Sequence, residues 1–502
     1  MSISMMVWLL GVGLAVSILI VSTRLQKWER TAAELAAGLL LASLPFVWIV
    51  FQDLPLILLA ATAHAWLLLL PARLTLGRLE RPFLHGSTQQ NALIGVSVLA
   101  ACALLQAWRP TEIAQTSLVL WMTASVCIGL FFLGQLWWNT RRYRLHAPTD
   151  SLPLSRLPTV SVCIPARNED HALVECLTSV LASTYPKLEV LVLDDCSQDA
   201  TSTIIRSFAH DGVRFIQGDT PADGWLGKNQ ALDTLAAHAS GDYLLFMDVD
   251  THLAPHSIEH LVHYSLTHGL EMTSVLPQSR LGVSAATTFG TLEYFWRLVL
   301  PITPKRAPVS SKLWMITKSS LIHLGGFASV SRKIVPEESF ARRLASSQMY
   351  RFLVSNAAFG VTTAKRWNSQ VETSIRLMYP RLQRQPMGVY GLCAALIALF
   401  VAPFMVLAVC SALGLTGPVF WVSLAAVVLL LLNYLLVLAR VQPKNWFVAA
   451  FAWPIVVVQD FALLVTSMLQ YEFGEVNWKG RNVCYPVVAV GRLAYVPRQT
   501  KR

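Results

Sequence analysis

The sequence predicts an α/β domain with a parallel sheet, inserted between two groups of transmembrane helices. Hydrophobic residues make up 54% of the 502 residues and charged residues only 14%, about half the share usual in a soluble domain. Apolar runs long enough to cross a bilayer lie in both terminal parts of the chain. Between them, short apolar strands alternate with helical patterns. This composition excludes a disordered protein, a coiled coil and an ordinary soluble enzyme.

Residues 1–140 are expected to form an N-terminal membrane domain of about five helices. Apolar runs near the required length of roughly 20 residues lie at 3–22, 32–51, 54–70, 92–108 and 117–138. The first run lacks a preceding basic segment and exceeds the core of a signal peptide, so we expect it to be retained. Basic loops lie at 23–31, 72–91 and 139–146. We expect a multi-pass protein of a bacterial inner or plasma membrane, and the positive-inside rule places the next domain in the cytoplasm.

Residues 150–385 are expected to form that cytoplasmic domain. The predicted strands are Thr159–Pro165, Leu188–Leu193, Val213–Gln217 and Tyr243–Val249. The predicted helices are His171–Ser183, Ala200–His210 and approximately Gln230–His238. Continuous apolar strands that alternate with helices are typical of a parallel sheet covered on both faces.

The C-terminal part is expected to hold a second membrane domain, residues 386–470, and a basic tail, residues 471–502. Its apolar runs lie at 388–412, 418–439 and 446–468. Three full crossings would place the basic tail outside, against the charge rule. We therefore expect two to three helices, with the run 388–412, which contains Pro403, as a hairpin or an interfacial segment.

The net charge of +11 does not point to nucleic acid, because the basic residues border apolar runs and form no stripe interleaved with aromatics. The eight cysteines are scattered without a C-x-x-C pair. That spacing argues against a disulfide scaffold and against a zinc site.

Polar residues follow the predicted strands where they end, which is where ligands bind in open α/β sheets. One strand leads into Pro165, Arg167 and Glu169, and another ends at Asp248-Val249-Asp250. Carboxylate oxygens together with a substrate diphosphate suit Mg²⁺ or Mn²⁺. We expect Asp248 and Asp250 to hold such an ion, the alternative being two solvated turn carboxylates.

Three further segments contain candidate binding or catalytic residues. Asp194 and Asp195 follow a strand and are expected to bind a nucleotide, because Ser197 and Asp199 are the better helix caps. Lys228 lies in a glycine-bounded loop at the start of a predicted helix. It is expected to bind a phosphate, the alternative being a solvated surface lysine. Glu337 and Glu338 follow Pro336, so they form a helix start or supply a general base.

These residues resemble family 2 glycosyltransferases of the GT-A fold, which is α/β and Rossmann-like. The matching segments are Ser161-Val-Cys-Ile-Pro-Ala-Arg-Asn-Glu169, Leu193-Asp-Asp-Cys-Ser-Gln-Asp-Ala-Thr201, Gly227-Lys-Asn-Gln-Ala231 and Phe246-Met-Asp-Val-Asp250. The resemblance covers under half of the chain. It implies that Asp195 contacts the nucleotide base, that Glu169 lies beside the nucleotide, and that the donor is a UDP-sugar, with a GDP-sugar as the alternative. It also implies that Glu338 is the base, at a position where the family has Asp.

One departure and two further similarities bear on the subfamily. Processive synthases of the family carry Q-x-x-R-W, and here Thr363 stands in place of the Gln. In contrast, Ile375-Arg-Leu-Met-Tyr379 and Trp478-Lys-Gly-Arg481 resemble lipid-modifying members, namely carotenoid- and hopanoid-associated transferases and ceramide glucosyltransferases. This similarity implies that Arg376, Trp478 and Arg481 bind substrate. A catalytic role for the tail requires it in the cytoplasm.

We therefore expect a membrane glycosyltransferase that moves one sugar from a nucleotide-diphosphate sugar to a lipid hydroxyl. The reaction is expected to be a metal-dependent direct displacement with inversion. The amphipathic segment Thr288–Ile302 is expected to form an interfacial helix or to pack on the sheet. The alternatives are a processive polysaccharide synthase, a transporter or scaffold with an inactive nucleotide-sugar-binding domain, and a regulatory sugar sensor.

Overall fold

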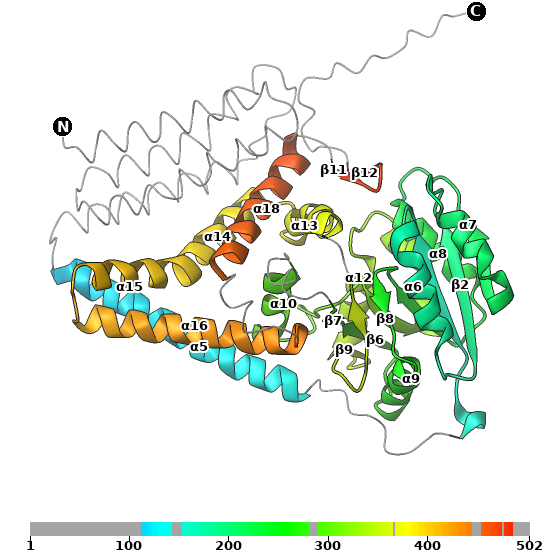
Figure 1. Cartoon of the computed structure of the whole chain (residues 1–502), viewed down its shortest axis with the longest axis horizontal. Coiled ribbons are helices and arrows are strands. Elements are labelled where there is room, and N and C mark those ends of the chain that lie inside the picture. Colours follow the sequence, from blue (N-terminus) through cyan, green and yellow to red (C-terminus); the bar gives the residue numbers. More distant parts are fainter. Residues whose placement is uncertain are drawn as a thin grey trace, which may run out of the picture.

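The structure is a computed structural model, and it describes residues 112–142, 153–280, 290–364, 367–443, 453–473 and 476–484. An α/β domain lies on one side of the molecule and a set of long helices on the other (Figure 1). The first four predicted membrane helices and residues 485–502 of the tail lie outside the described residues.

The α/β domain is built on a seven-stranded sheet with the order β3-β2-β1-β4-β8-β6-β9. The strands are β1 (Val160–Ala166), β2 (Leu188–Asp194), β3 (Val213–Gln217), β4 (Tyr243–Met247), β6 (Met272–Leu276), β8 (Leu313–Thr317) and β9 (Tyr350–Val354). The first four strands are parallel, as predicted. However, β8 is antiparallel to both β4 and β6, so the sheet is mixed and the prediction of a purely parallel sheet is wrong. An apolar buried strand has the same composition in either direction, which is why the sequence pattern does not reveal this reversal.

Helices and a small second sheet complete the domain. The helices are α6 (Asp170–Leu181), α7 (Thr201–Ser207), α8 (Gly227–His238), α9 (Ser257–Thr267), α10 (Gly290–Val299), α11 (Lys318–His323), α12 (Pro336–Ser346) and α13 (Trp367–Arg381). The small sheet has the order β5-β10-β7, with β5 (Thr251–His252), β10 (Thr362–Thr363) and β7 (Gln278–Ser279). Helix α8 begins three residues earlier than predicted, which places Lys228 in its first turn.

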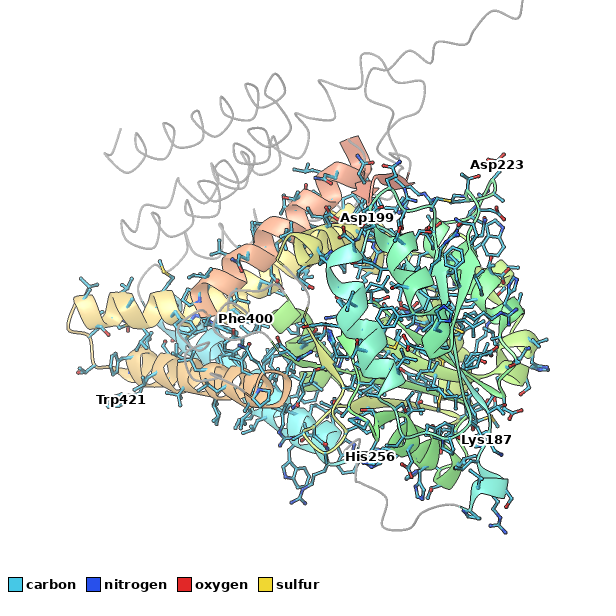
Figure 2. All side chains as sticks on the ribbon, turned by 45° about the vertical axis from the view of Figure 1, so that its right-hand side comes forward. Lys187, Asp199, Asp223, His256, Phe400 and Trp421 are labelled. Carbon is cyan, nitrogen blue, oxygen red and sulfur yellow. The ribbon has the colours of Figure 1, made fainter. Side chains whose placement is uncertain are left out.

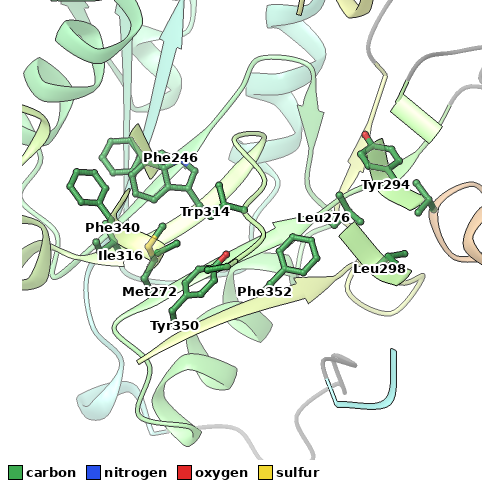
Figure 3. Close-up of a cluster of buried hydrophobic side chains, with 14 of the residues drawn as sticks. Phe246, Met272, Leu276, Tyr294, Leu298, Trp314, Ile316, Phe340, Tyr350 and Phe352 are labelled. Carbon is green, nitrogen blue, oxygen red and sulfur yellow. The ribbon is translucent and has the colours of Figure 1, made fainter. Parts of the chain in front are cut away.

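One continuous hydrophobic core joins the sheet to the long helices. Phe246 of β4 stacks on Trp314 of β8 with 4.4 Å between ring centroids, and Phe340 of α12 lies beside them (Figure 3). The same cluster continues through α10, where Phe295 is completely buried. Phe295 makes an edge contact with Phe400, which lies where the long helices meet the α/β domain (Figure 2). Helix α10 therefore fastens the α/β domain to these helices.

Four of the described helices are long and apolar enough to cross a membrane: Gln115–Arg142 within α5 (Glu112–Arg142), Pro386–Ala412, α16 (Pro418–Val441), and Trp453–Glu472 within α18 (Trp453–Phe473). Several of their large apolar side chains are exposed, including Leu130 of α5 and Trp421 of α16, which is 61% exposed (Figure 2). Such exposure is typical of a surface that contacts lipid or a partner.

The run after residue 386 corrects the sequence prediction. It forms α14 (Pro386–Leu396), a π-helical turn (Ile397–Val401) and α15 (Ala402–Ala412), which together make one continuous helix. The expected hairpin at 388–412 is therefore wrong, whereas the alternative of an interfacial segment stays a prediction. Pro403 lies in the first turn of α15, directly after the π turn, where the missing N–H of proline costs little.

Helix α18 is tied to the α/β domain at both of its ends. At its start, Trp453 packs against Tyr434 of α16, Phe400 and Phe295 of α10. Near its end, the Tyr471 hydroxyl donates a hydrogen bond of 2.8 Å to the carbonyl of Arg376 on α13. The chain then forms a hairpin of β11 (Val476–Trp478) and β12 (Arg481–Cys484). This segment, Val476–Cys484, is called the tail hairpin below.

Candidate functional site

A cavity of about 310 Å³ opens at the carboxyl ends of β1, β2 and β4. The predicted site residues that line it are Pro165, Arg167, Glu169, Asp195, Lys228, Asp248, Asp250, Arg376 and Trp478. Three strand ends therefore meet at one crevice, as the sequence suggested. We call this space the donor cavity.

Backbone contacts hold the first two strand ends together. Ala166 is paired with Asp194 in the sheet, and the next amide, that of Asp195, donates to the Ala166 carbonyl at 2.8 Å. The Arg167 guanidinium donates to the carbonyls of Asp195 and Cys196 at 2.5 and 2.9 Å. Arg167 thus fixes the loop that carries Asp195 while it lines the donor cavity.

Asp194 has a different place from the one predicted for it. Its carboxylate is buried and accepts a hydrogen bond of 3.0 Å from the amide of Ser197, so it stabilises the turn after β2. Asp194 is not among the residues that line the donor cavity. Asp199 accepts from the amide of Thr201, the first residue of α7, but the N-cap position itself is Ala200, so the expected cap by Ser197 or Asp199 is not at that position. The two aspartates therefore have different roles: Asp194 stabilises the turn, and Asp195 lines the donor cavity.

The tail hairpin closes one side of the donor cavity. Nη1 of Arg481 lies 2.7 Å from both carboxylate oxygens of Asp195. Nζ of Lys479 lies 3.0 Å from Oε1 of Glu169, and the Lys479 carbonyl accepts from Arg167. Two residues of the turn, Lys479 and Gly480, have φ of 50° and 76°, the left-handed region that favours glycine. The turn therefore brings Lys479 into the cavity lining, whereas Arg481 is not a lining residue and contacts the cavity through Asp195.

The two cations compensate carboxylates that are costly to bury. Burial raises the pKa of Asp195, while the bond from Arg481 acts in the opposite direction. Burial likewise raises the pKa of Glu169, and Lys479 opposes it. Removal of either cation would leave a buried carboxylate without its main compensating charge.

Trp478 and Arg376 form the wall opposite the strand ends. The Arg376 guanidinium lies 4.5 Å from the centre of the Trp478 ring, a cation–π contact. Burial lowers the pKa of Arg376, and the carboxylate of Asp248 opposes this. The two segments that the family resemblance marked, 375–379 and 478–481, therefore meet at this cavity.

Asp248 and Lys228 form the polar floor near β4. The Asp248 amide donates to the Lys312 carbonyl at 3.1 Å, which places its side chain directly after the strand. Nζ of Lys228 lies 2.5 Å from Oδ1 of Asp248. The neighbouring Asn229 is buried and donates to three carbonyls of the 330–333 segment, which anchors the start of α8.

Asp248 and Asp250 are a donor set of hard oxygens that fits Mg²⁺ or Mn²⁺. Within the part of the chain that the structure describes, no group of three or more His, Cys, Asp or Glu residues has the arrangement of a metal site. Two aspartates alone complete no coordination sphere. Such an ion would therefore take its other ligands from a diphosphate and from water.

Glu337 and Glu338 point to different surroundings, because successive residues of a helix lie about 100° apart. Glu337 is 2% exposed, and burial raises its pKa while Lys228 opposes the shift. Glu338 does not line the donor cavity. It lies on a second cavity and pairs with Arg342, one turn further along α12.

Sequence reasoning missed several residues that line the donor cavity: Glu175, His252, Ser369, Thr373 and Lys479. His252 is buried, and its Nε2 lies 3.1 Å from Oε2 of Glu175. Its place in the sequence, two residues after Asp250, was the feature that could have identified it. Ser369 and Thr373 precede Arg376 at helical spacing, so the sequence could have predicted that they lie on the same face of α13 as Arg376.

Comparisons with known proteins agree with this geometry. The sequence model of the family described as glycosyl transferase family 2 matches residues 161–321. That range contains β1, β2, β4 and the aspartates at their ends. This part of the chain, which supplies the strand ends at the donor cavity, is therefore similar to family 2 glycosyl transferases.

Similarity to individual proteins is confined to parts of their length. Glycosyltransferase AglE of Haloferax volcanii is 39% identical over 106 residues, which are 20% of this chain and 33% of that protein. A 4,4'-diaponeurosporenoate glycosyltransferase of Staphylococcus aureus is 33% identical over 147 residues, 29% of this chain and 37% of that protein. The matches thus span about a third of the length of these relatives. The solved mannosyltransferase PcManGT from Pyrobaculum calidifontis, in complex with GDP-Man and Mn²⁺, is 21% identical, with a TM-score of 0.42 over 70% of this chain and 98% of that chain.

Proposed function

We propose that this protein is a membrane glycosyltransferase that moves a single sugar from a nucleotide-diphosphate sugar, a UDP-sugar, to the hydroxyl of a membrane lipid. The observation that carries the proposal is the meeting of Asp195, Lys228 and the Asp248–Asp250 pair at one cavity. Four helices apolar enough to cross a membrane adjoin the same domain. The similarity to a 4,4'-diaponeurosporenoate glycosyltransferase supports a lipid-type acceptor.

The donor would lie along the strand ends. Asp195 and Glu169 accept hydrogen bonds from the base and the ribose, and Pro165 and Arg167 shape the loop beneath them. Lys228 and Arg376 supply positive charge for the diphosphate. Trp478 and Arg481 cover the nucleotide from the tail hairpin. Mg²⁺ or Mn²⁺ on Asp248 and Asp250 would neutralise the charge of the leaving diphosphate.

The proposed reaction is a single displacement between a donor held in the donor cavity and an acceptor that reaches Glu338 from the second cavity. Glu338 takes the proton of the acceptor hydroxyl, and the acceptor oxygen forms a bond to the anomeric carbon of the sugar. The bond from that carbon to the diphosphate oxygen breaks, and the nucleoside diphosphate leaves with the electron pair. Because attack and departure occur on opposite sides, the sugar configuration is inverted.

Transfer of one sugar is favoured over processive synthesis by the residue at position 363. Processive members carry Gln there, whereas Thr363 accepts a hydrogen bond of 3.0 Å from Lys312 beside β10. We propose that the α/β domain and the tail hairpin lie in the cytoplasm of a multi-pass membrane protein.

The first test is donor binding by the purified full chain, measured by titration calorimetry with a panel of UDP- and GDP-sugars. We expect one UDP-sugar to bind in the presence of Mg²⁺ or Mn²⁺, and EDTA to weaken binding at least tenfold. Asp250→Asn should lose the metal effect, whereas the exposed control Asp211→Asn should keep it. Equal binding with and without metal would contradict the metal assignment, and no binding of any nucleotide sugar would contradict the proposed function.

A further inference from the structure

A second cavity, of about 420 Å³, lies between the α/β domain and the long helices. One part of its wall is apolar and comes from the long helices and α13, through Leu392, Leu396, Leu464, Met378 and Leu382. Glu338, the candidate base, lines the same cavity. We call this space the acceptor cavity.

The other part of the wall is cationic. Arg297, Arg306, Arg342 and Arg381 line it, against two carboxylates, Glu338 and Asp460. An adjoining groove shares Glu338, Arg342 and Arg381 with the cavity. That groove adds three more cations, Arg332, Lys333 and Arg384, and no further carboxylate. Positive charge therefore dominates the whole approach to Glu338.

Two of the arginines are held close together in a half-buried position. The Arg306 guanidinium donates to the carbonyls of Pro301 and Trp296 at 2.9 Å each, so its place is fixed by the backbone. Burial and the neighbouring charge of Arg297 lower the pKa of Arg306. Four arginines face two carboxylates in this lining, so a bound anion would balance the remaining positive charge. Guanidinium groups bind phosphate and carboxylate oxygens through paired hydrogen bonds.

We propose that the acceptor cavity binds an anionic lipid, with its chains on the leucine wall and its charged headgroup on the arginines. The proposal rests on the proposed function and narrows it, because it names the chemical class of the acceptor. The headgroup carries the anionic group together with the hydroxyl that receives the sugar. A neutral lipid alcohol would match the leucine wall but would not balance the excess of four arginines over two carboxylates in the rest of the lining.

Lipid binding tests this without any sugar transfer. The full chain, purified in detergent, is incubated with equimolar phosphatidylglycerol and phosphatidylcholine, and bound lipid is counted by native mass spectrometry. We expect about tenfold more phosphatidylglycerol, the size of preference that one charge-assisted contact gives. The double variant Arg297→Gln/Arg381→Gln should lose the preference, whereas Arg206→Gln, an exposed arginine on α7, should keep it. Equal binding of the two lipids by the wild type, or an unchanged preference in the double variant, would overturn the proposal.

A second variant distinguishes lipid bound inside the acceptor cavity from lipid that is merely attracted to the basic groove. Leu392→Trp puts a larger side chain into the apolar wall and leaves every charge in place. We expect it to reduce phosphatidylglycerol retention while UDP-sugar binding, which reports an intact fold, is unchanged. Full retention in this variant would show that the lipid binds outside the acceptor cavity.

The charge of the reaction product provides an independent check. Membranes are incubated with radiolabelled donor, and the labelled lipid is applied to an anion-exchange column at neutral pH. We expect the labelled lipid to be retained, and a neutral labelled lipid would overturn the anionic acceptor. Absence of any labelled lipid, despite bound donor, would instead count against the proposed function and leave the lipid-binding result standing.

Discussion

Arg481 of the tail hairpin and Asp195 at the end of β2 form a two-point ion pair, with 2.7 Å from Nη1 to each carboxylate oxygen. The two residues are 286 positions apart in the sequence. Both side chains are largely buried, at 20% and 7% exposure. The far end of the described chain is therefore built into the donor cavity, so we expect the tail hairpin and the α/β domain to lie on the same side of a membrane.

The first prediction concerns this ion pair. Arg481→Gln should destabilise the tail hairpin by about 2 kcal/mol, because Asp195 stays buried without its charged partner. Hydrogen exchange of residues 476–484 should therefore become faster. The double variant Asp195→Asn/Arg481→Gln should recover most of this loss, since it leaves no uncompensated charge. Additive effects of the two single changes would mean that the pair contributes nothing to hairpin docking.

A second prediction uses the raised pKa of Glu337. A buried carboxyl with a raised pKa stabilises the fold most below its ordinary pKa, and this contribution is lost as the pH rises through the raised value. Glu337→Gln resembles the protonated form at every pH. Its Tm should therefore exceed that of the wild type at pH 8, and the difference should shrink toward pH 5. A Tm difference that does not change with pH would show that Glu337 is not buried as a carboxyl.

A third prediction concerns the diphosphate. Lys228→Gln should weaken UDP binding about tenfold or more, because a charge-assisted hydrogen bond to the diphosphate is lost. Titration calorimetry at constant ionic strength measures the effect. Lys305→Gln, an exposed lysine outside the donor cavity, is the matched control and should bind like the wild type. Unchanged UDP affinity in Lys228→Gln would show that Lys228 does not bind the diphosphate and only forms the ion pair with Asp248.

A fourth prediction concerns membrane topology. Helices α15 and α16 are joined by a short turn that lies far from the α/β domain, and α16 leads back from it toward the domain (Figure 1). A cysteine at Thr416 in that turn should react with an impermeant maleimide added outside intact cells. A cysteine at Asn477 in the tail hairpin should react only after the cells are permeabilised. Labelling of Asn477→Cys from outside would contradict the shared side of tail and domain.

Much of this architecture was predictable from local patterns. Apolar strands that end in Glu169, Asp195 and Asp248 identified the donor cavity, because parallel strands end at one edge of a sheet. The direction of β8 was not predictable, since burial makes both directions equally apolar. The continuous helix across Pro403 was missed because proline at the first turn after a π turn does not break a helix.

The rest depended on contacts between distant segments. Nothing near Asp194 and Asp195 in the sequence indicates that one aspartate stabilises a turn while the other meets Arg481. Similarly, the adjacent Glu337 and Glu338 read alike as sequence, yet helix geometry buries the first and places the second at the acceptor cavity. The arginine wall of that cavity comes from α10, the 301–309 segment, α12 and α13, so only the folded chain brings it together.

The central claim is tested most directly by transfer of radiolabelled sugar from a UDP-sugar to membrane lipid by the full chain. We predict one labelled lipid with a single added sugar, and a loss of roughly 10²–10⁴-fold in Glu338→Gln, the range for removal of a general base. Donor binding should be unchanged in that variant, and Glu337→Gln should retain transfer. A labelled long polysaccharide, or full transfer by Glu338→Gln with loss in Glu337→Gln, would contradict the account.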